Sequence, residues 1–341
     1  MTVSVGFIRT RYLGDSILLI PLIREVIRAF PKARITVIAN KGTTYPLERI
    51  PGVSALTMET AGNLGRLGST LSLAWKVRGT LDVLFDFTVS DRSRFLSRLS
   101  KAQRLGAAGS RSDFRKSDPW GTCIPIDLDH GPDHVTVQHG KLLSALGFPV
   151  TGVREKAFDP DPLWIDRAGN WVGSRLRAGA PLLFLHPGGR HWFKRWPPER
   201  FALLADQWVS RTGGSVVVAG ASSERTLVES VLSGTRNPGI HPMVGEAVGL
   251  LDGVIRQATV FVGNDSAPLH MADAAHIPLV GLFGSTLPSV WGPTASPRRE
   301  VVYHPLPCSP CTHTGCPLGE ENCLASVSVA EVFGSVEKVL G

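Results

Sequence analysis

Polar side chains that could bind a phosphate or move a proton follow short apolar runs in the second half of the chain. Residues 260–262 predict a buried strand, and Asn264, Asp265 and Ser266 follow soon after it. Ligands bind at the carboxyl ends of strands in an open parallel sheet, and a helix that begins there offers free N–H groups to a phosphate. Asp265 therefore either holds such a ligand or only caps the helix over residues 269–275.

Two further loops have the same position after a predicted strand. One apolar run leads into Gly188 and Gly189, with Lys194 soon after, and another, residues 215–219, ends in a loop that holds Glu224. The repeat of strand, polar loop and helix predicts a parallel sheet whose loops converge at one edge. A lysine and glycine N–H groups at that edge have the chemistry to neutralise a phosphate.

A carboxylate also stands near the start of the chain. Residues 3–8 predict a strand, and Gly14 and Asp15 precede a long amphipathic helix over residues 16–30. The loop lacks the G-x-G-x-x-G spacing, which disfavours a nicotinamide-binding site. Asp15 either caps the helix, which contributes about 1 kcal/mol, or serves as a general base in a cleft.

Four of the five cysteines lie close together near the end of the chain. Their spacing is C-x2-C-x4-C-x6-C, formed by Cys308, Cys311, Cys316 and Cys323. Four thiolates in so short a segment can form a tetrahedral shell for zinc or iron, so we predict a structural metal site. The alternatives are reduced, buried cysteines, or a partial site that includes His304 or His313.

Taken together, these motifs resemble glycosyltransferase family 9, the heptosyltransferases. The resemblance is carried, in chain order, by Gly14-Asp15, the Gly188-Gly189 loop with residues 194–197, residues 220–224, Asn264-Asp265-Ser266 with His270, residues 282–286, and Trp291-Gly292-Pro293. It spans nearly the whole chain. One departure is the pair Ala267 and Pro268, where the family usually has Gly, and the proline removes one N–H from this loop.

The resemblance implies an α/β fold of the GT-B class, with two Rossmann-like domains that face each other across a cleft. It implies inverting transfer of a heptose from ADP-heptose to an acceptor hydroxyl in lipopolysaccharide core synthesis, with no catalytic metal. Asp15 would be the base, and Lys194 would stabilise the leaving diphosphate. The other implied donor contacts are N–H groups near Gly188, Gly189 and Ser266, Glu224 at the ribose, Glu246 at the base pocket, Asp265 at the sugar–phosphate end, and His270 in support of it.

The positive charge of the chain is concentrated in its first half. Residues 1–150 hold 20 Lys and Arg against 12 Asp and Glu, whereas the remainder holds 16 against 17. Either an anionic partner or solubility alone would account for this excess. Nucleic acid is disfavoured because no nucleic-acid motif accompanies the charge. We predict that an anionic glycan or glycolipid acceptor contacts Arg9, Arg11, Arg94 and Arg98.

A length of 341 residues predicts two domains. We expect an acceptor-binding Rossmann-like domain over 1–150, a linker and connecting helix over 151–178, a nucleotide-sugar domain over 179–325 with the cysteine cluster at 308–323, and a C-terminal helix, 326–341, that packs on the first domain. No apolar run reaches the ~20 residues that span a bilayer, and the N-terminus lacks the basic region of a signal peptide. We therefore expect a cytoplasmic protein, with peripheral contact at the inner membrane as an option.

Three alternatives stay open at this point. Another GT-B transferase could use a UDP- or GDP-sugar, the acceptor could be a protein or a small metabolite, and the chain could bind a nucleotide sugar without turnover. The presence of Asp15 and Lys194 favours an enzyme, because a subunit that only binds needs no base in its cleft.

Overall fold

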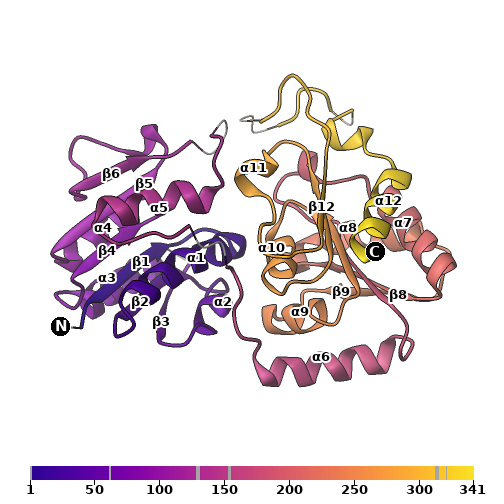
Figure 1. Cartoon of the computed structure of the whole chain (residues 1–341), viewed down its shortest axis with the longest axis horizontal. Coiled ribbons are helices and arrows are strands. Elements are labelled where there is room, and N and C mark those ends of the chain that lie inside the picture. Colours follow the sequence, from indigo (N-terminus) through magenta and orange to yellow (C-terminus); the bar gives the residue numbers. More distant parts are fainter. Residues whose placement is uncertain (1, 61–62, 128–130, 153–154, 312–314, 320) are drawn as a thin grey trace. The chain divides into compact units, whose positions relative to one another are not determined.

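The computed structural model describes residues 2–60, 63–127, 131–152, 155–311, 315–319 and 321–341. The chain divides into two compact units, Met1–Asp159 and Pro160–Gly341, and the division falls inside the predicted linker. Within the described residues, each unit holds one six-stranded parallel sheet with helices on both faces (Figure 1). Both units therefore have the α/β organisation that the sequence predicts.

The sheet of the first unit has the strand order β3-β2-β1-β4-β5-β6. Its strands are β1 (Ser4–Arg9), β2 (Arg34–Asn40), β3 (Val53–Met58), β4 (Val83–Asp86), β5 (Arg104–Gly109) and β6 (Thr122–Pro125). Its helices are α1 (Leu13–Ala29), α2 (Tyr45–Glu48), α3 (Asn63–Val77), α4 (Asp91–Ser100) and α5 (Val135–Ala145). Helix α1 packs against α5 and α2, and α3 packs against α4. Strand β1, at the centre, is buried at every residue, as expected for a parallel strand covered on both faces.

The second unit repeats this plan with the order β12-β11-β10-β7-β8-β9. Its strands are β7 (Leu182–His186), β8 (Ser215–Gly220), β9 (Ile240–Val244), β10 (Val260–Asn264), β11 (Leu279–Phe283) and β12 (Arg299–Tyr303). Its helices are α6 (Pro162–Arg175), α7 (Pro198–Thr212), α8 (Arg225–Ser233), α9 (Val248–Ile255), α10 (Ala267–Ala274), α11 (Pro288–Trp291) and α12 (Val329–Leu340). The winding direction changes between β7 and β10, so the loops after these two strands leave the same edge side by side, where such sheets bind ligands.

The core of the second unit is built around two buried tryptophans. Trp196 and Trp208 lie among apolar side chains of β7, β8, β10 and α7, and the Trp196 indole N–H donates to the Val327 carbonyl at 3.0 Å. The apolar face of α12 joins this core through Phe333 and its valines. The C-terminal helix therefore belongs to the second unit, and its predicted packing on the first domain stays a prediction. None of the helices in the described parts of the chain is long and apolar enough to cross a membrane.

The structure corrects three local details of the sequence analysis. Helix α1 begins at Leu13 and not at residue 16, so Asp15 stands in its first turn. Lys101, which its spacing in the sequence predicts on one helical face with Arg94 and Arg98, lies beyond α4 as a left-handed C-cap. Strands β5, β6, β9 and β12 were not predicted.

Candidate active site

Four loops meet at the carboxyl edge of the second unit's sheet, after the neighbouring strands β11, β10, β7 and β8. Glu224, in the loop after β8, reaches across to the loop after β7. Its carboxylate accepts the Gly189 N–H at 3.1 Å and the Ala221 N–H at 2.9 Å. A Cβ at Gly188 would overlap the carboxyl group of Glu224, so a larger residue there would displace this carboxylate from the loop. The two predicted donor loops are thus joined by one carboxylate.

A buried amide ties the loop after β7 to β10. Asn264 ends β10 and has no exposed surface. Its Nδ2 donates to the carbonyls of Pro187 at 2.8 Å and Gly188 at 3.2 Å, and its Oδ1 accepts the Trp196 N–H at 3.0 Å. Both ends of the side chain are therefore used to hold the glycine loop in place.

His186 lies between two predicted donor residues. Its Nδ1 is 3.1 Å from the Ser266 hydroxyl, and its Nε2 is 3.7 Å from the Glu224 carboxylate. Burial lowers the pKa of His186 to about 4; Glu224 opposes this shift and Arg195 adds to it. The ring is therefore neutral at pH 7. Ser266 is the N-cap residue of α10, yet its hydroxyl makes no cap bond and contacts His186 and the Asn264 carbonyl instead.

The remaining predicted donor residues lie around this centre. Asp265 is half-buried, and its Oδ2 accepts the Thr286 hydroxyl of the loop after β11 at 2.7 Å. His270 is buried in α10, and Glu246 is exposed directly after β9. The structure thus brings Gly188, Gly189, Glu224, Asp265 and Ser266 to one edge of the sheet, with Glu246 after the outermost strand of the same edge.

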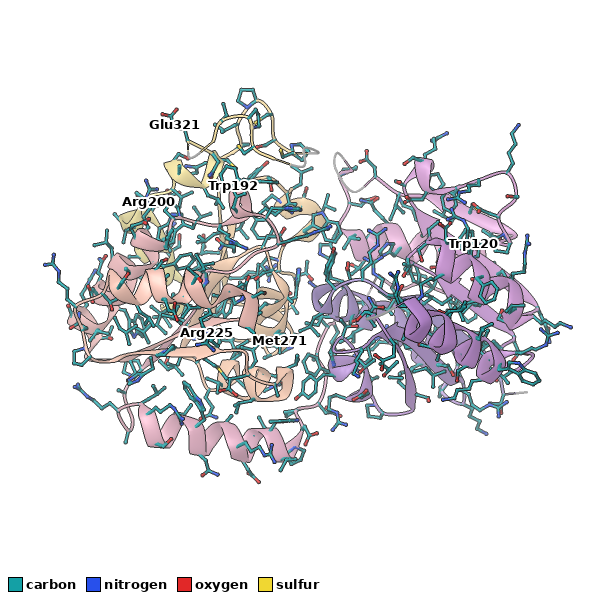
Figure 2. The ribbon with its side chains drawn as sticks, turned by 180° about the vertical axis from the view of Figure 1, so that it is seen from behind. Trp120, Trp192, Arg200, Arg225, Met271 and Glu321 are labelled. Atoms are coloured by element: carbon teal, nitrogen blue, oxygen red, sulfur yellow. The ribbon has the colours of Figure 1, made fainter. Side chains whose placement is uncertain are left out.

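Lys194 ends a short 3-10 helix, Trp192–Lys194, just after the glycine loop. Its side chain is half-buried. The next residue, Arg195, fixes the loop by donating to the Gly189 carbonyl from Nε at 2.9 Å and from Nη2 at 2.7 Å. Trp192 is 48 % exposed at the start of this segment (Figure 2). The segment therefore supplies one lysine beside a glycine loop that an arginine holds rigidly.

The predicted base lies at the corresponding edge of the first unit's sheet. Asp15 follows β1, and its Oδ2 accepts the Tyr12 N–H at 3.1 Å, which closes the first turn of α1. Its Oδ1 pairs with Arg9, whose guanidinium also donates to the Phe87 carbonyl. The exposed fractions of these two side chains are 10 % for Asp15 and 6 % for Arg9. Asp15 is thus both a helix-turn residue and a carboxylate oriented by a buried arginine.

The four predicted acceptor arginines have different environments. Arg9 is buried against Asp15, and Arg11 is exposed, with its Nη2 3.3 Å from the Thr88 carbonyl. Arg94 is mostly buried over the ring of Trp120 (labelled in Figure 2), and it donates to Asp118 at 2.6 Å, to Asp91 at 3.2 Å and to the Asp113 carbonyl. Arg98 is exposed. Arg94 therefore holds the segment after β5 in place, unlike Arg98.

The cysteine cluster does not form the predicted metal shell in the described residues. Cys308 is exposed, Cys311 and Cys316 are half-buried, and Cys323 is 7 % exposed. Burial raises the pKa of the Cys323 thiol, and the neighbouring Cys316 and Cys308 raise it further. Across the described ranges, no three His, Cys, Asp or Glu side chains are grouped closely enough to hold a metal ion. His313 lies outside the described residues.

Sequence reasoning missed the residues that join the loops. His186, which only begins the glycine loop, was given no role, and Asn264 and Thr286 were named only as parts of longer polar segments. Each follows or ends a buried strand at the ligand-binding edge, and that position is the signal that could have identified them.

Comparison with known proteins places this geometry in context. The model of glycosyltransferase family 9 (heptosyltransferase) matches residues 80–321. Lipopolysaccharide heptosyltransferase 3 of Escherichia coli K12 is 26 % identical over 298 residues, which cover 83 % of each chain. Lipopolysaccharide heptosyltransferase 1 of Pseudomonas aeruginosa is 32 % identical over 141 residues, which cover 40 % of this chain and 38 % of that protein.

Solved structures agree on the fold. The family 9 glycosyltransferase from Veillonella parvula has a TM-score of 0.85 at 20 % identity, with 99 % of this chain and 97 % of that chain covered. The Escherichia coli ADP-heptose lps heptosyltransferase II has a TM-score of 0.77 at 19 % identity, with 100 % and 98 % covered. The predicted GT-B class is confirmed by these likenesses together with the two parallel sheets.

Proposed function

Because the chain belongs to glycosyltransferase family 9, a family of heptosyltransferase enzymes, we propose that it transfers a heptose from ADP-heptose to a hydroxyl group of a lipopolysaccharide core acceptor, with inversion at the anomeric carbon. The observation that carries this proposal is the junction of four strand-end loops through Glu224, Asn264 and Asp265. Such a rigid polar edge beside a lysine suits a nucleoside diphosphate sugar.

The diphosphate would lie at the glycine loop and the start of α10. Lys194 would neutralise charge that develops on the leaving diphosphate, and the N–H groups of the loops would add hydrogen bonds to it. Glu224 would contact the ribose, Asp265 the sugar–phosphate end with His270 behind it, and Glu246 the base pocket. Preorganisation supports these roles, because polar groups that are already fixed need no reorganisation when the bond breaks.

Asp15 would take the proton. As the acceptor hydroxyl loses its proton to Asp15, its oxygen forms a bond to the anomeric carbon, and the bond from that carbon to the diphosphate breaks in line. ADP leaves with the electron pair of the broken bond. Because the acceptor oxygen attacks from the opposite face, the configuration of the anomeric carbon is inverted. Arg9 orients the carboxylate, and each carboxylate oxygen keeps a lone pair beyond the Arg9 and Tyr12 bonds.

The names of the relatives support the substrates. Two of the similar proteins are named for lipopolysaccharide and one for ADP-heptose. A lipid-borne acceptor of this kind would place the enzyme in the cytoplasm, in peripheral contact with the inner membrane. The predicted protein acceptor has no comparable support.

The decisive experiment is a product assay with the full chain. ADP-heptose, a UDP-sugar and a GDP-sugar are each incubated with a heptose-deficient lipopolysaccharide core, and the product is analysed by mass spectrometry and by NMR of the new anomeric bond. We expect one added heptose from ADP-heptose alone, with inverted configuration. Transfer from a UDP- or GDP-sugar, retention of configuration, or binding of ADP-heptose without turnover would each contradict the proposal.

A further inference from the structure

A cavity of about 550 Å³ opens at the carboxyl edge of the first unit's sheet. The loops after β1 and β4, the start of α4 and the side chain of Arg66 on α3 surround it. The lining residues that matter here are Arg11, Arg66, Thr88, Ser90, Asp91 and Arg92. Arg94 and Arg98, the arginines expected to receive the acceptor, are not part of the lining.

The cavity brings guanidinium groups together with little compensating negative charge. Arg92 is held by Thr70 Oγ1 at 2.9 Å and by the carbonyls of Glu59 and Arg66 at 3.1 Å, all of which are uncharged groups. Burial lowers the pKa of Arg92, and the positive charge of Arg66 lowers it further. Two like charges are therefore held near each other, an arrangement that an anion would stabilise.

Among the described lining residues, only Asp91 carries a carboxylate, and it is already paired with arginines outside the cavity. Asp91 lies 3.2 Å from the Arg94 guanidinium and 3.1 Å from that of Arg115, both outside the cavity. Arg11 is exposed and adds a third positive charge. The electrostatic balance of the cavity is therefore strongly positive.

The start of α4 gives the cavity a fixed wall. Ser90 caps the helix by accepting the Ser93 N–H at 3.2 Å. The buried Asp86 accepts the N–H groups of Thr88 at 2.7 Å and Val89 at 3.0 Å, which holds Val89 at a φ of +51°. The first N–H groups of an α-helix have no carbonyl partner within the helix, so this wall also favours an anion.

We propose that this cavity binds a phosphomonoester on a sugar of the acceptor. A phosphomonoester carries about two negative charges at pH 7 and accepts hydrogen bonds on three oxygens, which matches several arginines better than a single carboxylate does. The volume exceeds that of a phosphate ion and falls in the range of small-molecule sites, so a saccharide fits as well. This inference rests on the proposed transfer to a saccharide acceptor.

The test uses the full chain without donor. Mannose 6-phosphate is titrated at low salt into the wild type, Arg66→Gln, Arg11→Gln and the matched control Arg78→Gln, and binding is followed by calorimetry. Arg78 is exposed just after α3 and does not line the cavity. Arg66 is exposed on its helix, so Gln should keep the fold, and a thermal melt of each variant verifies this. We expect saturable wild-type binding, about tenfold weaker binding for Arg66→Gln and Arg11→Gln, affinity within about twofold of wild type for Arg78→Gln, and no binding of mannose.

Three results would overturn the proposal: no wild-type binding, equal loss of affinity in Arg66→Gln and Arg78→Gln, or equal binding of mannose. The outcome is separable from that of the transfer assay, which needs ADP-heptose and measures turnover. If transfer occurs and mannose 6-phosphate does not bind, only the cavity assignment fails. If mannose 6-phosphate binds through Arg66 and no saccharide is modified, the anion site stands and its assignment to an acceptor falls.

Discussion

The two units present polar residues at the same edge of similar sheets, but they use them differently. In the second unit, Glu224, Asn264 and Asp265 are bonded to neighbouring loops, so this edge is rigid before any ligand arrives. In the first unit, Arg11 and Arg66 line a cavity in which the carboxylate of Asp91 is paired with arginines outside the lining. The difference suggests a preformed donor site in one unit and a charge-driven site in the other.

The largest effect is expected for Asp15→Asn. Asp15 differs from the cavity arginines of the first unit, because its carboxylate is already bonded to Arg9 and to the Tyr12 N–H. Transfer should fall by about 10²- to 10⁴-fold, because Asn cannot accept the proton. Stability should also fall by about 3 kcal/mol, because Arg9 remains buried without its carboxylate. Steady-state turnover and chemical denaturation measure the two effects.

The double variant Asp15→Asn with Arg9→Met separates the loss of transfer from the loss of stability. Removing both charges should restore much of the stability while transfer stays lost. Recovery of turnover together with stability would show that Asp15 has only a structural role.

Lys194→Ala tests whether the rigid edge binds a diphosphate. The KM for ADP-heptose should rise and kcat should fall, together by about 10- to 1,000-fold in kcat/KM, since one charge on the leaving group is no longer neutralised. The acceptor KM should stay unchanged. Lys338→Ala, at an exposed site on α12, serves as the charge-matched control. Equal kinetics for the two variants would remove Lys194 from the site.

His186 predicts how the second unit responds to acid. Its pKa is about 4 in the folded protein and near 6.5 when unfolded, so only the unfolded chain binds a proton between these values. Stability should therefore be unaffected above pH 7 and should fall by up to about 3 kcal/mol as the pH drops from 6.5 to 4.

Denaturation of the wild type and of His186→Asn across this pH range measures that contribution. His139, which burial also holds neutral, adds a loss of the same sign in the first unit. The difference between wild type and variant isolates His186, and parallel pH profiles would contradict the assignment.

Arg94→Gln and Arg98→Gln have the smallest expected effects. They test whether acceptor binding extends beyond the cavity that Arg11 and Arg66 line. Arg94→Gln should cost about 2 kcal/mol, because its bonds to Asp118 and the Asp113 carbonyl are lost. Arg98→Gln should stay within about 0.5 kcal/mol of wild type. Neither should change the acceptor KM as much as Arg66→Gln does. A larger rise in acceptor KM for Arg94→Gln than for Arg66→Gln, at retained stability, would favour the acceptor arginines that the sequence predicts.

The sequence was a good guide wherever a strand is apolar and ends in a polar loop. Strands β1, β7, β8, β10 and β11 were predicted close to their observed bounds, and with them the edge that holds Glu224 and Asp265. Their burial on both faces requires continuous apolar runs, which are easy to recognise.

The missed strands lack that pattern for physical reasons. Strand β5 reads RLGAAG and has little side chain to pack, β9 contains a proline, and β12 begins with two charged residues. β9 and β12 are edge strands, where prolines and charges are tolerated. The sequence therefore described the centre of each sheet better than its margins.

The partners of long polar side chains could not be predicted either. Arg94, Arg98 and Arg66 look alike in the sequence, yet one anchors the segment after β5, one faces solvent and one lines a cavity. The spacing of residues along a helix predicts which of them share one face. It does not predict which side chains pack against that face, because these come from distant segments of the chain. The same limit applies to the cysteines, whose spacing alone does not determine where their sulfur atoms point.

The Asn264 amide has a consequence for motion. Opening the loop after β7 would break its bonds to the Pro187 and Gly188 carbonyls and to the Trp196 N–H. Each buried group left unbonded costs about 1–3 kcal/mol, so the open form should be populated well below one per cent of the time. Donor entry and ADP release would then take place past a loop that is closed almost all of the time. The slow steps of the catalytic cycle should be sought in other parts of the chain.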